Sequence, residues 1–158
     1  MLTTGFNHIA TLTNDAARLH RFYEEVFEAE VLRDGPEIEG NDGVRLSIVK
    51  IGPWSELNVF QIDGNTEADR QVPMFERGRL DHFALQADSI DAFETIRNRL
   101  IAGGAADAFV TDFGPVLSVF FRDPDGLEGE VCVTNPDAVP GVTNPPGTPS
   151  ARYVASAD

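Results

Sequence analysis

Three side chains in the sequence combine metal-ligand chemistry with matched placement: His8, His82 and Glu130. The segments FNHIA (residues 6–10) and LDHFA (residues 80–84) each hold one histidine after an apolar–polar pair, although the chain has only three histidines. Two neutral imidazoles and one carboxylate leave coordination positions open. The set therefore suits a divalent metal ion that also holds a substrate or a water molecule.

The elements that must position these residues form an internal repeat, which decides a fold more firmly than local propensity does. Apolar periodicity and turn residues predict the same order, βαβββ, in both copies. In the first copy, we expect strands at about 5–13, 30–33, 44–51 and 56–62 and a helix at about 15–27. In the second copy, we expect strands at about 80–87, 107–112, 116–122 and 127–134 and a helix at about 89–102.

Local signals agree with these limits. Asn14 or Asp15 can cap the first helix, and Gly103 with Gly104 ends the second. The run DPDG (residues 123–126) is a strong turn signal before the last strand. If the copies pair around a pseudo-twofold axis, their opening strands come together. The closing strand of copy two then brings its carboxylate to the two histidines.

Asn58 holds the position in copy one that Glu130 holds in copy two. An amide oxygen is a poor ligand for a transition metal, although it can hydrogen-bond to a metal-bound water. Asn58 is therefore the candidate for a fourth position, and Glu56 and Gln61 lie near enough in sequence to substitute for it. Glu128 shares a strand face with Glu130 and is the competing carboxylate, but a solvated charge at a strand end is the expected role.

The remaining polar candidates are weaker. His20 lies outside the apolar stripe of the first helix, so we expect a surface role for it. Cys132 follows Glu130 by two residues and either faces the same cavity or is a buried, inert thiol. Ser47 and Ser118 read as matched across the copies. The candidate cavity lining is Ser47, Phe60, Ser118, Phe120 and Cys132.

Composition limits the partners. The 158 residues carry a formal net charge of −14, which is a poor match for nucleic acid or an anionic membrane. A small-molecule substrate is the expected partner. One cysteine allows no internal disulfide, and the sequence shows no signal peptide and no membrane-length apolar run. We therefore expect a cytoplasmic protein.

We expect a single domain over residues 1–158. It would consist of module 1 (5–63), a connector (64–78), module 2 (79–134) and a Pro-rich C-terminal arm (135–158). Proline excludes regular structure from the arm, which could be a loose end or could lie over a surface.

With these residues in view, the chain resembles the vicinal oxygen chelate superfamily, which includes glyoxalase I, bleomycin- and fosfomycin-resistance proteins and extradiol dioxygenases. The resemblance covers about residues 5–134. It rests on NHIATLTNDAARLHRFYEEVF, on DHFALQADSIDAF and, most specifically, on LSVFFRDPDGLEGEV. It implies an α+β fold of two βαβββ modules, which form a curved, mostly antiparallel eight-stranded sheet around a cavity, with the helices outside.

The resemblance places His8, His82 and Glu130 on the family's metal-ligand positions, with Glu130 as the catalytic residue that holds the ion. It implies a divalent metal cofactor, which could be Fe, Zn, Mn, Ni or Co, and lyase- or isomerase-like chemistry on vicinal oxygens. Asn58 stands where many members have glutamate. This departure leaves two rivals open, a non-haem Fe(II) dioxygenase and a metal-free binding or drug-resistance protein. A homodimer is expected in each case.

Overall fold

A computed structural model describes residues 2–3, 5–37, 40, 43–70, 72, 75–76 and 80–153 of the chain. The chain forms two compact units, Met1–Gln71 with Pro124–Gly126, and Val72–Asp123 with Leu127–Asp158. Parts of the predicted connector and the last five residues of the predicted arm lie outside the described residues. Within the described ranges, no helix is long and apolar enough to cross a membrane.

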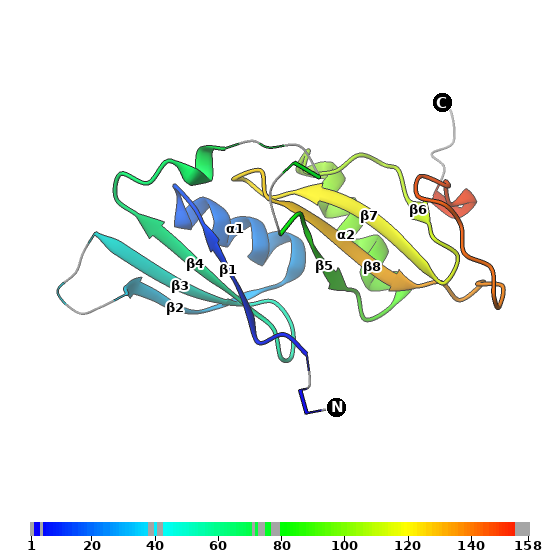
Figure 1. Cartoon of the computed structure of the whole chain (residues 1–158), viewed down its shortest axis with the longest axis horizontal. Helices are drawn as coiled ribbons and strands as arrows, with labels where there is room; N and C mark the ends of the chain where they lie inside the picture. Colours follow the sequence, from blue (N-terminus) through cyan, green and yellow to red (C-terminus); the bar gives the residue numbers. More distant parts are fainter. Residues whose placement is uncertain are drawn as a thin grey trace. The chain divides into compact units, whose positions relative to one another are not determined.

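The first unit is a four-stranded sheet with one long helix (Figure 1). The sheet order is β1-β4-β3-β2, in which β1 runs parallel to β4 and the other pairs are antiparallel. The elements are β1 (His8–Leu12), α1 (Ala16–Phe27), β2 (Glu30–Pro36), β3 (Val44–Lys50), β4 (Glu56–Ile62) and a short 3₁₀ helix, η1 (Glu67–Asp69).

Helix α1 begins at a side-chain cap and packs on one face of this sheet. The carboxylate of Asp15 accepts a hydrogen bond from the backbone N–H of Arg18 at 2.9 Å, which satisfies one open donor of the first turn. Apolar residues of α1 then pack against Val49 of β3 and against Leu57 and Val59 of β4. The core formed in this way contains Leu19, Tyr23, Val49, Leu57 and Val59.

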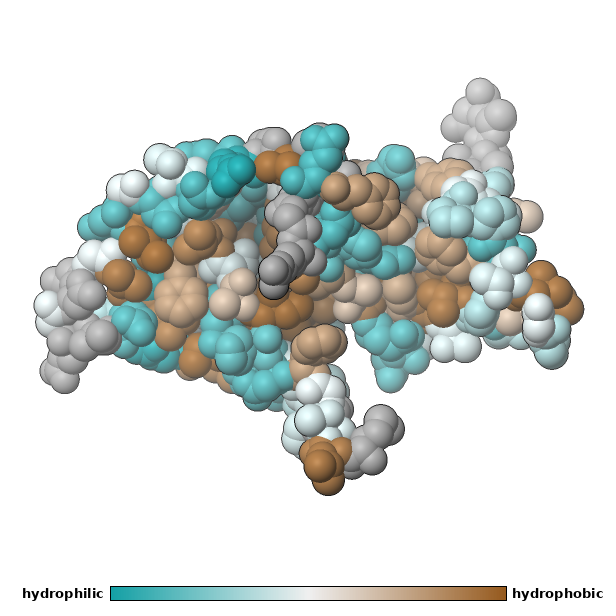
Figure 2. Space-filling view, in the orientation of Figure 1, coloured by the Kyte–Doolittle hydropathy of each residue, from teal (hydrophilic) through white to brown (hydrophobic). Residues whose placement is uncertain are grey.

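The opposite face of this sheet carries the other set of alternating residues. Leu46 and Ile48 of β3 and Asn58 and Phe60 of β4 pair with one another across the strands and are half-buried. Figure 2 shows hydrophobic side chains gathered over β3 and β4 in this view. Asn58 therefore lies on a largely apolar face.

The second unit repeats the arrangement, with the order β5-β8-β7-β6 and β5 parallel to β8. Its helix is capped by Ser89, whose hydroxyl accepts from the backbone N–H of Ala92. The elements are β5 (Phe83–Gln86), α2 (Ile90–Ala102), β6 (Thr111–Asp112), β7 (Val116–Arg122), β8 (Glu128–Thr134) and the 3₁₀ helix η2 (Ala151–Tyr153). Its most deeply buried apolar side chains are Phe93, Leu100, Leu117, Val119, Phe121 and Val131.

The Pro-rich arm lies against the outer edge of this second sheet. The backbone N–H of Asp112 donates to the carbonyl of Thr148 at 2.7 Å, and that of Ser150 donates to Val110 at 2.9 Å. Tyr153 is buried against α2, with its ring 5.8 Å from that of Phe93. The arm thereby covers a strand edge that would otherwise expose unpaired backbone groups.

The predicted α+β class with two βαβββ modules is confirmed, and the hydrogen bonding of the described strands defines two four-stranded sheets. Three strands are clearly shorter than expected, and one is longer. β1 spans only His8–Leu12, β5 begins after His82, and β6 holds only Thr111 and Asp112, whereas β2 extends to Pro36. Before β6, the carboxylate of Asp107 accepts from the backbone N–H of Phe109 at 2.9 Å. This local turn competes with strand pairing and shortens the strand.

The strand registers correct the match between the two serines. Asn58 pairs with Ala10 and Glu130 pairs with Ala84, each two residues after the histidine of its copy, so these two positions are equivalent as predicted. In the neighbouring strands, Asn58 pairs with Ile48 and Glu130 pairs with Phe120. The same register aligns Ser118 with Leu46 and leaves Ser47 one residue out of step. A shift of one residue moves a strand side chain to the other face of its sheet. Ser47 consequently lies on the face that packs against α1.

Replacing Gly129 with alanine is expected to destabilise the second unit. A Cβ at this position would lie 2.3 Å from the ring of Phe121, so the ring must move. Overpacking of this kind costs about 1–3 kcal/mol of the free energy of unfolding, which chemical denaturation measures. Gly35→Ala is the control, because its Cβ meets nothing within 4 Å. Equal stability of the two variants would contradict the prediction.

Candidate active site

Four polar side chains of the second unit form a connected cluster around Glu130. Asp81 Oδ2 lies 2.8 Å from His82 Nδ1 and accepts its hydrogen, which leaves the lone pair of Nε2 available. Nε2 lies 3.6 Å from Glu130 Oε2, beyond hydrogen-bond distance. The hydroxyl of Ser118 donates to the other oxygen, Oε1. The side chains of His82 and Glu130, the two potential ligands, are therefore each oriented by a hydrogen bond, His82 by Asp81 and Glu130 by Ser118.

Phe120 and Cys132 surround this cluster. The ring of Phe120 meets the imidazole of His82 edge to face, with centroids 5.9 Å apart. Cys132 pairs with Ser118 in the strand register and is a free cysteine. Burial, and then the neighbouring carboxylate of Glu130, raise the pKa of the Cys132 thiol to about 12. The thiol stays protonated at neutral pH, which agrees with the inert alternative for this residue.

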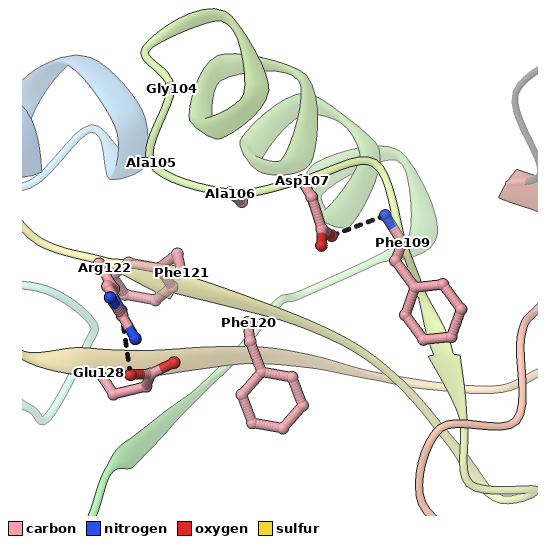
Figure 3. Close-up of a pocket in the computed structure, with 9 residues that line it drawn as sticks. All are labelled: Gly104, Ala105, Ala106, Asp107, Phe109, Phe120, Phe121, Arg122 and Glu128. Carbon is pink, nitrogen blue, oxygen red and sulfur yellow. Dashed lines mark hydrogen bonds and ion pairs between the residues drawn. The ribbon is translucent and has the colours of Figure 1, made fainter. Parts of the chain in front are cut away.

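A cavity of about 460 Å³ opens beside the cluster (Figure 3). Its size falls within the range of small-ligand pockets. Phe120 lines it from β7, and Phe109 lines it from the loop that follows α2. Figure 3 shows both rings facing the open space. Glu128 and Arg122 form an ion pair at the other end, with Nε and Oε2 3.3 Å apart.

The structure corrects the expectation for Glu128. The residue is only 8% exposed and lines the cavity, so it is not a solvated charge at a strand end. It lies on the strand face of Glu130, because the two are separated by one residue of β8. Sequence reasoning found this shared face but missed Arg122, Asp107 and Phe109, whose residue types and spacing gave no sign of a site and which reach the cavity only through the fold.

The first unit holds a related pair of residues. His8 begins β1 and is exposed, and its Nδ1 lies 2.8 Å from the side-chain oxygen of Asn7. This contact again leaves the lone pair of Nε2 available. His8 pairs with Glu56, two residues before Asn58 on β4, so His8 and Asn58 share a sheet face. The side-chain oxygen of Asn58 is buried and has no hydrogen-bond partner among the described residues.

The predicted site residues are thus gathered in two groups. The second unit brings together His82, Glu130, Ser118, Phe120 and Cys132, and the first unit places His8, Asn58 and Phe60 on one face. Within either unit, no three described His, Cys, Asp or Glu side chains gather in a way that could hold a metal ion. The three-residue set of His8, His82 and Glu130 stays a prediction.

His20 is buried, so the expected surface role is wrong. It is 8% exposed and stands one helical turn from Ala16, on a buried side of α1 that is wider than the apolar stripe. Its Nε2 has no hydrogen-bond partner among the described residues. Burial lowers the pKa of His20. The carboxylates of Asp34 and Glu24 oppose this shift, and the guanidinium of Arg45 reinforces it.

His20 is expected to make stability fall in acid. Because its folded-state pKa lies below its ordinary value of 6.5, the unfolded chain binds the proton more tightly. Its contribution is complete above that value and is lost as the pH falls through the folded-state pKa. His20→Gln removes this titration. Denaturation of both proteins at about pH 7.5 and about pH 5 measures the difference, and a pH-independent difference would contradict the prediction.

A family model described as Glyoxalase/Bleomycin resistance protein/Dioxygenase superfamily matches residues 5–131. No curated protein matches the chain. Several solved structures are similar, and each is covered almost completely.

A glyoxylase/bleomycin resistance protein/dioxygenase domain from Frankia sp. EAN1pec is 20% identical, with a TM-score of 0.68 and coverage of 85% of this chain and 95% of that one. A glyoxalase family protein from Enterococcus faecalis is 27% identical, with a TM-score of 0.63 and coverage of 84% and 99%. A mutant of the fosfomycin resistance protein FosX from Listeria monocytogenes, complexed with Mn(II) and dihydroxypropylphosphonic acid, is 18% identical. Its TM-score is 0.61, with coverage of 87% and 98%.

Proposed function

Because the chain belongs to the Glyoxalase/Bleomycin resistance protein/Dioxygenase superfamily, we propose that it is a metal-dependent enzyme of the glyoxalase type. Its substrate would be a small molecule with two adjacent oxygen atoms, and its chemistry would be lyase- or isomerase-like. The observation that carries the proposal is the pair of His82 and Glu130, whose potential ligand atoms face each other at 3.6 Å. The Mn(II) complex of FosX, which has the same fold, supports a divalent cofactor.

Two side chains of the second unit, His82 and Glu130, are spaced as two ligands of one divalent ion would be. Ligand atoms that stand about 2.0–2.2 Å from one shared ion lie about 3.0–3.5 Å apart, and the observed separation is close to this range. A carboxylate behind a ligating imidazole is the usual outer partner in metal sites, and Asp81 supplies it here. Nitrogen and oxygen ligands suit Fe, Zn, Mn, Ni or Co in the divalent state.

His8 is the proposed third ligand, on the strength of the sequence repeat and the family. Its side chain repeats the arrangement seen at His82. In each case the side-chain oxygen of the preceding residue, Asn7 or Asp81, lies at hydrogen-bond distance from Nδ1, and Nε2 is left available. The buried, unpartnered oxygen of Asn58 supports a ligand-facing role for the same sheet face. Asn58 would contact a substrate or a water molecule more readily than the ion, because amide oxygens are weak ligands for these metals.

A divalent ion bound there would act as a Lewis acid toward two adjacent substrate oxygens and stabilise an enolate-like anion. The side chains would do the rest. Glu130 holds the ion, and the cavity between Phe120 and Phe109 receives the apolar body of the substrate. The carboxylate of Glu128, buried in the same cavity, is the group that would accept and return a proton.

One observation favours a second function, a non-haem Fe(II) dioxygenase. With Asn58 in place of a glutamate, the proposed ligand set is two histidines and one carboxylate, which is the set of many Fe(II) oxygenases. Oxygen uptake that requires Fe(II) and a vicinal diol would establish this reading. Turnover without oxygen would exclude it.

Metal analysis of protein purified without added metal tests the proposal, and we expect about one divalent ion per chain. Catechol and a hydroxyketone, added separately to the Co(II)-substituted protein, should shift its visible spectrum if they coordinate. A protein that takes up no metal would be a metal-free binding protein of the resistance type. A spectrum that no vicinal-oxygen compound shifts would exclude the chelating substrate.

We also propose a homodimer. The arm covers the outer edge of the second sheet, but among the described residues β2, the outer strand of the first sheet, pairs only with β3. Phe6 and Trp54 of the first unit are 85% and 83% exposed, which is unusual for large aromatic side chains. Sedimentation equilibrium should give twice the chain mass of 17.2 kDa. A monomeric mass at micromolar protein concentration would contradict the proposed homodimer.

A further inference from the structure

Ser118 is the buried partner of the central carboxylate of the candidate site. It lies in the middle of β7 with 0% of its surface exposed, and its hydroxyl donates to Glu130 Oε1. A hydrogen bond to a carboxylate is stronger than one between neutral groups and holds its acceptor in one orientation. The second oxygen, Oε2, is thereby left on the side of His82 Nε2.

We infer that Ser118 is a positioning residue: its hydroxyl occupies Oε1, so that Glu130 presents only Oε2, beside His82 Nε2, to a divalent metal ion. The inference rests on the proposed function, because it concerns the same site. Without the hydroxyl, the carboxylate of Glu130 could rotate or bind an ion through both oxygens. Residues that orient metal ligands in this way commonly change metal affinity by about 10–100-fold.

In the first unit, the position equivalent to Ser118 holds a residue that cannot orient a carboxylate. The strand register aligns Ser118 with Leu46, just as it aligns Glu130 with Asn58. The half-buried leucine has no hydroxyl, and the Asn58 oxygen beside it has no hydrogen-bond partner among the described residues. The hydroxyl thus occurs in the copy that has the carboxylate.

Ser47 provides a matched control. It is also 0% exposed in the middle of a strand, and its hydroxyl also donates to a carboxylate, Asp34 Oδ1, at 2.9 Å. The Asp34 carboxylate is already paired with Arg45 and lies on the sheet face that packs against α1. Removal of either serine hydroxyl deprives a carboxylate of one donor, but only Ser118 acts on a proposed ligand.

The experiment titrates metal-free full-length protein with Co(II) and follows the visible absorption of the bound ion. Ser118→Ala should raise the dissociation constant by about 10–100-fold, because Glu130 is no longer held in one orientation. It should also shift the absorption bands, because Glu130 can then bind through both oxygens. Ser118→Thr, which keeps the hydroxyl, should recover most of the affinity. Ser47→Ala should bind Co(II) as the wild type does. Thermal unfolding of the metal-free proteins should show similar losses of stability in both alanine variants.

Three results would overturn the inference while leaving the proposed function standing. They are an unchanged Co(II) affinity in Ser118→Ala, an equal loss of affinity in Ser47→Ala, and a threonine variant that binds no better than the alanine variant. A wild-type protein that takes up no Co(II) would overturn the proposed function, and the inference with it.

Discussion

Replacing His82 with alanine is expected to remove most of the bound divalent metal from the purified protein. The proposed site has few protein ligands, and the imidazole of His82 is the one whose Nε2 faces Glu130 Oε2 at 3.6 Å. Loss of a direct ligand should exceed the roughly 10–100-fold effect of losing an outer partner, so the variant should retain little metal after dialysis. Elemental analysis and Co(II) titration both measure this loss.

His20→Gln is the control for the removal of a histidine. His20 is buried between α1 and the first sheet, where its neighbours are Asp34 and Arg45. The variant His20→Gln should therefore have the same metal content as the wild type. The double variant His8→Ala/His82→Ala should retain as little metal as His82→Ala alone, since ligands of one ion act as a unit. Equal metal in the wild type and the double variant would show that the site assignment is wrong.

Replacing Asn58 with glutamate is expected to tighten metal binding and to suppress turnover of a chelating substrate. Asn58 is the register equivalent of Glu130, it shares a sheet face with His8, and its side-chain oxygen is buried without a partner among the described residues. A carboxylate there would add a ligand to the proposed site. If the new ligand contributes as much as a hydrogen bond to a charged group, about 1.5–3 kcal/mol, metal affinity should rise by about 10–150-fold.

The added ligand would fill a position that the substrate needs, so activity should fall by about 10-fold or more. Asn58→Gln is the matched control, because glutamine has the length of glutamate without its charge. It should change metal affinity little. If Asn58→Glu binds metal no more tightly than the wild type does, Asn58 does not face the ion, and the open-site argument fails.

The fold was accessible to sequence reasoning because two physical signals reinforced each other. Alternating apolar residues and turn residues located eight strands, and the repeat supplied their order in each copy. The first helix was predicted to within about one residue at its start, since Asp15 is both a good cap and the observed one. The errors lie at strand ends, where local hydrogen bonds such as that from the backbone N–H of Phe109 to the carboxylate of Asp107 compete with strand pairing.

Side-chain direction was the weaker part of the prediction. Pattern matching aligned LSIV with LSVF and so equated Ser47 with Ser118. The pairing of β3 with β4 and of β7 with β8 shows that Ser47 lies on the face that packs against the helix, whereas Ser118 lies on the face of the candidate site. The same limit affected His20 and Glu128, which were expected in solvent and are both 8% exposed. Burial of a polar residue depends on which side chains surround it in the folded protein, and these cannot be predicted from its neighbours in the sequence.

The sequence alone determined the class of fold and the duplication, and it predicted the three ligand residues, because these follow from residue type and period. The tertiary structure alone decided which groups hydrogen-bond to His82 and Glu130. Asp81 on His82 and Ser118 on Glu130 are contacts of side chains whose geometry depends on strand register and rotamer. The cavity beside Phe120 likewise exists only because β7, β8 and the loop after α2 meet. Contacts between residues distant in sequence are set by packing, and local sequence patterns carry no record of packing.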